Sequence, residues 1–323
     1  MKKYSFLLAL LTIVYHSQAQ TGASKKSDAD AIKSRTLIVV EEESNPDLTK
    51  KLEGESLQFY TEEINNYNRL IKELFPKYWK YNSSIEFKKR SEVNNLIKSK
   101  SKDYAYVEWS KFRINFANKM SLEATRKLKS GGVQLFGSDY IETSLDIRLT
   151  DNNPLGIPVY GVYLPGPFCS LADLVFGLKQ IQLQLNYKSE GKRDGEINNM
   201  YKENAKEMPK FTLLVNASAS NIAEKDIAKY YKHPIQLVTQ DKIEEALINE
   251  SVDKVVVIFI PRSGGKISPI MVDAATGREM IRSLPDWNAG VGISTAGLDA
   301  IKDDMNKGKL RKDDYKIISK QID

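Results

Sequence analysis

The sequence has few of the residues that build disulfides, metal sites and nucleophilic catalytic sets. Its 323 residues contain one cysteine, Cys169, and two histidines. One cysteine cannot form an intramolecular disulfide, so we expect the fold to depend on its hydrophobic core. His16 lies in the N-terminal segment that is predicted to be removed, which leaves His233. A zinc site made of histidines is therefore excluded, and the sequence predicts no metal ligand and no cofactor.

The chain also lacks a concentrated charge of one sign. Its formal charge of +6 falls to +4 when Lys2 and Lys3 are removed with the N-terminal segment. The basic run 88–90 is short and is flanked by Glu86 and Glu92. Because a nucleic-acid-binding protein gathers its cations on one face, no nucleic acid is expected as a partner.

The N-terminus has the pattern of a secretory signal peptide. Lys2 and Lys3 precede the apolar run 6–14, and the small residues of 17–19 precede a cleavage site near Ala19. The run is too short to span a bilayer, so no transmembrane segment is expected in the mature chain. We therefore expect a periplasmic or secreted protein. Residues 20–34, which are polar, are predicted to form a flexible leader.

Hydrophobic periodicity predicts an α/β (α+β) fold of two similar units with mixed sheets. Each unit has the order β-α-β-α-β-β-β-α; the first is predicted at 35–187 and the second at 210–323. Residues 188–209 begin with a charged, glycine-containing stretch and are predicted to be a linker. The predicted strands are 36–40, 85–87, 104–109, 140–149, 157–164, 211–215, 234–238, 255–260, 266–272 and 278–281. The predicted helices are 48–74, ended by Pro76, then 91–97, 170–187, 222–231, 241–247 and 294–305.

The middle parts of the two units align without a gap at an offset of 150 residues. Apolar and polar character repeats through the predicted helix cap, the helix face and the entry of the next strand. Any two β-α-β segments share some of this pattern, so a chance similarity stays open. The matched pairs are Ile85 with Ile235, Phe87 with Leu237, the predicted N-caps Ser91 and Asp241, Val93 with Ile243, Ile97 with Leu247, and Asp103 with Asp253.

Three local features invite a chemical interpretation. His233 precedes a predicted strand, where a loop histidine is a simpler interpretation than a catalytic base. Cys169 begins a predicted helix whose dipole could acidify a thiol, yet a buried structural cysteine is expected because no base lies nearby in sequence. Residues 263–266 have the sequence Ser-Gly-Gly-Lys, but they lack the phosphate-loop spacing and precede a strand, which favours a hairpin turn.

Two further features leave alternatives open. Tyr78, Trp79 and Tyr81 could stack on sugar rings, although aromatic residues near a helix end are more typical of a core. Acidic residues are abundant, so a carboxylate pair that hydrolyses glycans stays possible, but no particular pair is marked.

A resemblance rests on the second half of the chain. Asp253 and Lys254 precede the apolar run 255–258, and 272–278 reads Val-Asp-Ala-Ala-Thr-Gly-Arg. This stretch resembles the bacterial envelope module of the TolB N-terminal part and of CsgG-type secretion proteins, over about 211–305 and more weakly over 35–187. The first half has Asp103 and a turn near Asp151, but it lacks the Thr-Gly. With no lipidated N-terminal cysteine and no propeller repeats, the resemblance implies neither a pore nor the partners of the propeller. The body, rich in Lys, Asn and Tyr, also resembles uncharacterised exported proteins of Bacteroidota.

These observations favour a non-enzymatic periplasmic protein that binds or helps to assemble an envelope component, either a protein or a cell-wall component. The alternative is a carboxylate-dependent hydrolase that acts on glycan or peptidoglycan. A small-ligand sensor with an apolar pocket between the halves is a third hypothesis. The sequence identifies no individual catalytic or binding residue for any of the three.

Overall fold

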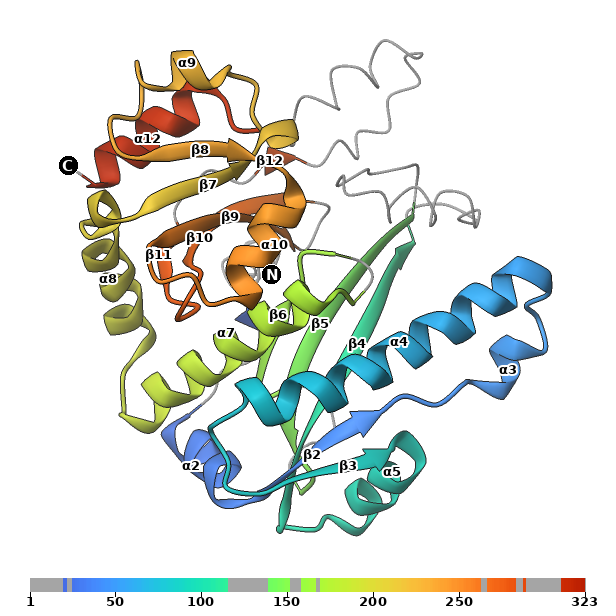
Figure 1. Ribbon diagram of the computed structural model, residues 1–323. Helices are drawn as coiled ribbons and strands as arrows, with labels where there is room; N and C mark the ends of the chain where they lie inside the picture. Colours follow the sequence, from blue (N-terminus) through green and yellow to red (C-terminus); the bar gives the residue numbers. More distant parts are fainter. Residues whose placement is uncertain are drawn as a thin grey trace, which may run out of the picture.

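A computed structural model describes residues 20–21, 25–115, 139–151, 158–166, 169–262, 266–282, 287–288 and 309–322. These residues form two β-sheets, with helices between the sheets and on their outer faces (Figure 1). The α/β fold predicted from the sequence is confirmed. The predicted signal peptide at 1–19 lies outside the described residues.

The first sheet contains the strands β1 (Gln20–Thr21), β2 (Thr36–Glu41), β3 (Ile85–Lys89), β4 (Tyr104–Asn115), β5 (Asp139–Leu149) and β6 (Tyr160–Tyr163). Their order is β1-β6-β5-β4-β2-β3. β2 is parallel to β3 and to β4, and the other pairs are antiparallel. The first sheet is therefore mixed, as predicted.

The second sheet contains the strands β7 (Thr212–Asn216), β8 (Ile235–Val238), β9 (Lys254–Arg262), β10 (Lys266–Asp273), β11 (Glu279–Ile281) and β12 (Trp287–Asn288). The order is β11-β10-β9-β7-β8, and β12 pairs with β10. β7 is parallel to β8 and to β9, and the remaining pairs are antiparallel. This sheet is mixed as well.

The series β3-β2-β4-β5-β6 and β8-β7-β9-β10-β11 have the same order and directions. Equivalent hydrogen bonds lie at the start of the parallel strands in the two sheets. The N–H of Thr36 donates to the carbonyl of Asp103 at 3.1 Å, and the N–H of Thr212 donates to the carbonyl of Asp253 at 2.9 Å. Asp103 and Asp253 are one of the pairs matched in the sequence. Such agreement is what an internal duplication predicts. The corresponding register pairs are Leu37 with Ile85 and Leu213 with Ile235.

The helices are α2 (Lys26–Ser34), α3 (Pro46–Thr49), α4 (Gly54–Tyr78), α5 (Arg90–Ser99), α7 (Leu171–Ser189), α8 (Asp194–Ala205), α9 (Glu224–Ile227), α10 (Gln240–Ile248) and α12 (Lys312–Ile322), with the 3-10 turns η1 (Met208–Lys210) and η2 (Ala217–Ala219). The prediction of a last helix at 294–305 falls outside the described residues, and α12 is an additional helix.

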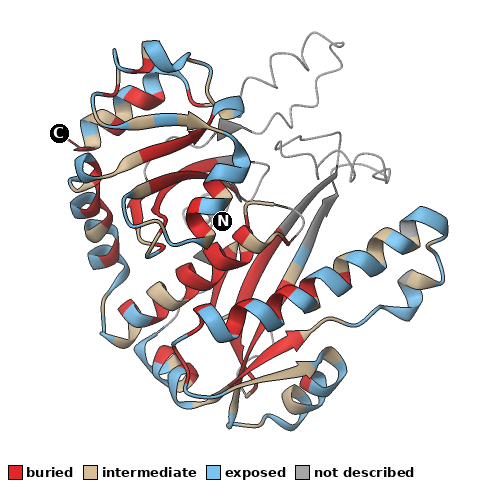
Figure 2. Ribbon diagram, viewed as in Figure 1, coloured by how far each residue is buried: buried red, intermediate tan, exposed pale blue. Residues whose placement is uncertain are grey.

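Helices and sheets alternate in layers. α5 covers one face of the first sheet, where Val93 packs with Ile38 of β2. α4 and α7 cover the opposite face, and their hydrophobic core continues across α7 to Val256 of β9. α8 and α12 cover the far face of the second sheet, where Tyr315 packs with Leu213. Figure 2 shows the buried residues concentrated in the strands and along α7, while the outer side of α4 is exposed.

α7 joins the two units because it is buried around most of its circumference. Ser170 caps it by accepting a hydrogen bond from the N–H of Asp173 at 3.0 Å. Near its middle, Nζ of Lys179 donates to the carbonyl of Ala274 at 2.9 Å. The side chain of Gln180 donates to the carbonyl of Gly277. The buried apolar residues that the structure describes between the sheets belong to one hydrophobic core.

The segments predicted as a leader and a linker each contain a helix. Residues 26–34 form α2, whose Ala29 and Ile32 are fully buried. The amide of Asn82 donates to the carbonyls of Ile32 and Arg35, which fixes the end of α2 against the first unit. In the linker, residues 194–205 form α8, and Ile197 is buried against α7 through Tyr187. Both segments are polar overall, so their composition does not reveal the few apolar side chains that are buried.

The predicted helix ends also differ from the structure. Pro76 lies inside the last turn of α4, and the N–H of Trp79 still donates to the carbonyl of Phe75 at 2.9 Å. Ser91 is not the N-cap of α5, because the helix begins at Arg90 and the N–H of Ser91 donates to Oε2 of Glu43 at 2.7 Å. Likewise, α10 begins before Asp241, with Thr239 at the N-cap position. The first two differences depend on hydrogen bonds that spacing alone does not reveal.

Candidate functional site

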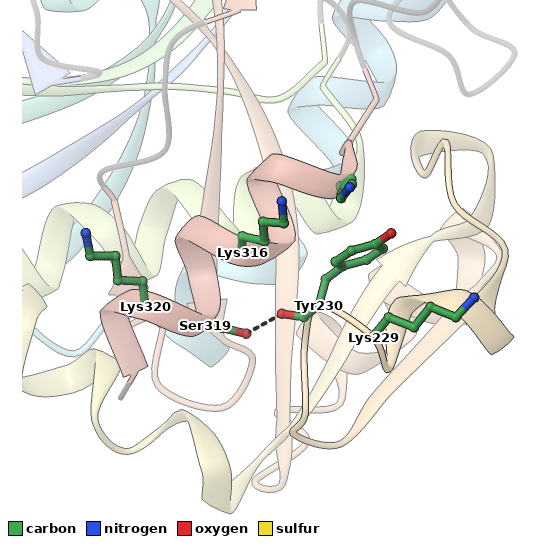
Figure 3. Close-up of a pocket in the computed structure, with 6 residues that line it drawn as sticks. Lys229, Tyr230, Lys316, Ser319 and Lys320 are labelled. Atoms are coloured by element: carbon green, nitrogen blue, oxygen red, sulfur yellow. Dashed lines mark hydrogen bonds between the residues drawn. The ribbon is translucent and has the colours of Figure 1, made fainter.

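A groove lined by lysines lies at the outer surface of the second unit, next to α12. The lysines of α12 are four residues apart and share one exposed side of the helix. The opposite side is fixed because Tyr315, Ile318 and Ile322 are buried in the second core. The lining residues, which together we call the Tyr230 groove, are Lys229, Tyr230, Lys312, Lys316, Ser319 and Lys320 (Figure 3).

The second wall of the groove comes from the segment after α9. Tyr231 is buried and anchors this segment in the core, which leaves its neighbour Tyr230 half-buried at the surface. The two walls are tied together by Oγ of Ser319, which donates to the carbonyl of Tyr230 at 2.7 Å (Figure 3). The groove is open to solvent and has a volume of about 620 Å³.

The Tyr230 groove is electropositive. Nζ of Lys312 lies 5.2 Å from the centroid of the Tyr230 ring, and Nζ of Lys316 lies 5.8 Å from it. Lys316 also pairs with Asp313 at 3.3 Å, and Lys229 pairs with Asp226 at 2.7 Å. The hydrogen bond that Lys229 donates to the carboxylate of Asp226 raises the pKa of Lys229 above its usual value.

Two of the four lysines keep their full charge available to a ligand. Within the described part of the chain, Lys312 and Lys320 have no ion-pair partner, and both are exposed. Lysine ammonium groups donate hydrogen bonds and accept none. The arrangement can therefore bind anions.

A second charged group lies at the carboxyl ends of β2 and β3. Arg90 follows β3 and forms ion pairs with Glu42 at 2.5 Å and with Glu108 of β4. Arg148 of β5 continues the chain of charges, pairing with Glu108 at 2.6 Å and with Asp146 at 2.8 Å. We call these five residues the Arg90 cluster. Because α4 and α5 leave β2 and β3 toward opposite faces of the sheet, the cluster occupies the kind of switch point where α/β sheets bind ligands.

Most of the charge in the Arg90 cluster is compensated internally. Burial raises the pKa of Glu42, against the lowering effect of Arg90. Burial likewise raises the pKa of Asp146, although Arg148 and the hydroxyl groups of Ser144 and Ser110 lower it. The arrangement is a paired network of three carboxylates and two guanidinium groups.

The second unit has apolar residues where the first has this network. Glu108 pairs across the strands with Asp146, and the equivalent pair in the second sheet is Ile258 with Ile270. Those isoleucines are buried in the core that includes α7. The equivalent sheet face is therefore buried against the other unit in the second unit, whereas in the first unit it carries the charged side chains of the Arg90 cluster.

The residues singled out by the sequence are not brought together into a site. Cys169 is buried, and burial raises the pKa of its thiol well above the usual range, which fits a structural role. His233 lies against Tyr231 with their ring centroids 5.4 Å apart. Residues 263–265 lie outside the described residues, and Lys266 begins β10.

The aromatic trio is part of the core. Tyr78, Trp79 and Tyr81 are 6%, 2% and 6% exposed, so they offer no platform for a sugar ring. The hydroxyl of Tyr78 donates to the carbonyl of Ile248 at 2.7 Å, which ties α4 to the end of α10. The core interpretation of these residues is confirmed.

The turn 273–277, which carries the resemblance to envelope modules, has a packing role. The carboxylate of Asp273 accepts hydrogen bonds from the N–H of Ala275 at 3.0 Å and from the hydroxyl of Thr276 at 2.8 Å. Gly277 has a positive φ of 76°, and an added Cβ would lie 2.5 Å from Cβ of Lys179. The turn therefore fits closely against α7.

The Tyr230 groove was not identified from the sequence, although Lys312, Lys316 and Lys320 have helical spacing.

Among the described residues, no group of three or more histidine, cysteine, aspartate and glutamate side chains is placed to hold a metal ion. None of the helices that the structure describes combines the length and apolar composition of a membrane span. No protein-family model, curated protein or solved structure matches the chain.

Proposed function

We propose that the protein is an exported, non-enzymatic binding module that attaches to an anionic component of the cell envelope through the Tyr230 groove. The observation that carries the proposal is the convergence of four exposed lysines on one groove, with Asp226 and Asp313 as their acidic neighbours. The resemblance to the envelope modules of TolB and CsgG-type proteins agrees with this role and stays a prediction.

Export is supported by the signal-peptide pattern of residues 1–19. The mature protein should be found in the periplasm or the medium, and its first residue should be Gln20. Cell fractionation followed by N-terminal sequencing measures both. Recovery of a cytoplasmic protein that begins at Met1 would contradict export.

Binding is tested by cosedimentation of the purified protein with washed envelope fragments. Lys312→Glu/Lys320→Glu reverses the two groove lysines that have no ion pair among the described residues. The matched control is Lys33→Glu/Lys98→Glu, because Lys33 and Lys98 are exposed residues of α2 and α5, which pack on the first unit, and the control changes the net charge equally. We expect sedimentation of the wild type and the control, and its loss in the groove variant. Equal sedimentation of all three proteins would contradict the proposal.

The alternative of a carboxylate-dependent hydrolase is favoured by one observation. Glu42 and Glu108 both contact Arg90, so two acids lie at one place, and burial raises the pKa of Glu42. Release of reducing sugar from peptidoglycan or polysaccharide by the wild type, and its loss in Glu42→Gln and Glu108→Gln, would support this activity. A wild type that releases no sugar would exclude it.

A further inference from the structure

The charges of the Tyr230 groove form a row. Lys312, Lys316 and Lys320 follow one another at four-residue intervals, so neighbouring lysines are about 6 Å apart along the axis of α12. The whole row is about 12 Å long. A row of cations fits a chain that carries negative charge at regular intervals better than it fits one compact anion.

An aromatic ring lies beside this row. Tyr230 is half-buried, and the ammonium groups of Lys312 and Lys316 lie within 6 Å of its ring centroid. The hydrogen bond from Ser319 to its carbonyl holds this wall against α12 (Figure 3). A sugar ring can pack its C–H face on such a side chain while an attached carboxylate reaches a lysine.

The composition of the lining separates this surface from a membrane-binding one. A membrane-surface helix inserts large apolar side chains between the headgroups. The lining of the groove consists of lysines, Tyr230 and Ser319 and contains no aliphatic hydrophobic residue. On α12, Tyr315, Ile318 and Ile322 are buried in the protein core.

We infer that the anionic component is an acidic polysaccharide, a chain of sugars that carry carboxylates. The chain lies along α12, its successive carboxylates contact Lys312, Lys316 and Lys320, and one of its rings packs on Tyr230. This inference rests on the proposed function because both use the same groove.

The test is a calorimetric titration of the full mature chain with a hexamer of galacturonic acid. A glucose hexamer, linear polyphosphate and vesicles with phosphatidylglycerol are titrated in parallel. We expect the galacturonate hexamer to bind, and the affinity to rise from the dimer to the tetramer as the chain reaches all three lysines. Lys312→Glu/Lys320→Glu should weaken binding by about tenfold or more. Tyr230→Leu should also weaken it, whereas Lys33→Glu/Lys98→Glu should not.

The outcomes separate this inference from the proposed function. Lysine-dependent binding of polyphosphate or of the vesicles, without binding of the galacturonate hexamer, would overturn the inference and leave the proposed function standing. Absence of lysine-dependent binding for every probe would overturn both. Equal affinity of the wild type and Tyr230→Leu for the hexamer would overturn the sugar contact. Circular dichroism of each variant checks that the helix content of the wild type is retained.

Discussion

Substitution of Gly277 by alanine tests how the second unit is fixed to α7. Gly277 ends the turn 273–277 at a positive φ of 76°, and its carbonyl accepts a hydrogen bond from Gln180. A Cβ at this position would lie 2.5 Å from Cβ of Lys179 and 3.4 Å from its Cδ. Carbon atoms prefer separations of about 3.5–4.0 Å, so the turn and α7 must move apart by about 1 Å.

The expected loss of stability has two parts. An alanine in the left-handed region costs about 1–2 kcal/mol. The close contact between the added Cβ and Lys179 costs a further 1–3 kcal/mol, because overpacking a well-packed site costs about that much. The reduced entropy of the unfolded chain returns about 0.4–1 kcal/mol. We therefore expect Gly277→Ala to lower the free energy of unfolding by about 2–4 kcal/mol.

Gly54→Ala is the matched control, because Gly54 has a φ of 53° and no atom within 4 Å of an added Cβ. It should cost about 1 kcal/mol, from the backbone conformation alone. Urea unfolding followed by circular dichroism measures both variants, with the slope m checked for two-state behaviour. Equal losses for the two variants would refute the close packing of the turn on α7.

Three other predictions concern groups on α7 or next to its first turn. Lys179→Met should lower the free energy of unfolding by about 1–3 kcal/mol, because the carbonyls of Ala274 and Leu247 lose the hydrogen bonds that Lys179 donates. The control is Lys206→Met, which removes the exposed ion pair with Glu203 and should change the free energy of unfolding by less than about 0.5 kcal/mol in the same urea titration. Burial raises the pKa of Asp173 from 3.8 to about 6, so its protonation favours the folded state and this stabilisation is lost as the pH rises from about 4 through 6. The difference in unfolding free energy between the wild type and Asp173→Asn should therefore change by at most about 3 kcal/mol across pH 4–7, and a pH-independent difference would contradict the raised pKa. Cys169 should react with a thiol reagent only after unfolding in urea, and rapid labelling of the native protein would show that its thiol is accessible.

The central strands of both sheets, such as β2 and β9, could be predicted because their apolar runs are continuous. β2 and β9 are buried on both faces, and such strands show an unbroken run of Val, Ile and Leu. The alignment at an offset of 150 residues also found the equivalent strand entries, Asp103 and Asp253. Local composition sufficed here because burial on both faces leaves a strong pattern.

The missed helices had weaker patterns. α2 has two fully buried apolar side chains among nine mostly polar residues, and its position depends on the distant Asn82. α8 buries Ile197, Tyr201 and Ala205 at intervals of four residues, a helical signal that its charged neighbours obscure. In both helices, tertiary contacts outweigh the polar composition.

The candidate site could be predicted only in part. The spacing of Lys312, Lys316 and Lys320 is visible in the sequence, but such a row is also typical of an ordinary solvated helix face. What makes it a groove is Tyr230, which precedes α12 by more than eighty residues and is brought there by the burial of Tyr231 and Tyr315. Only the folded structure joins these two segments.

Hydrogen–deuterium exchange with and without the bound envelope fraction tests the central claim most directly, because it locates the binding surface. The account predicts slower exchange in 309–322 and in 226–231, which form the Tyr230 groove, and unchanged exchange in 85–99, next to the Arg90 cluster. Slower exchange at 85–99 together with unchanged exchange in α12 would contradict the account.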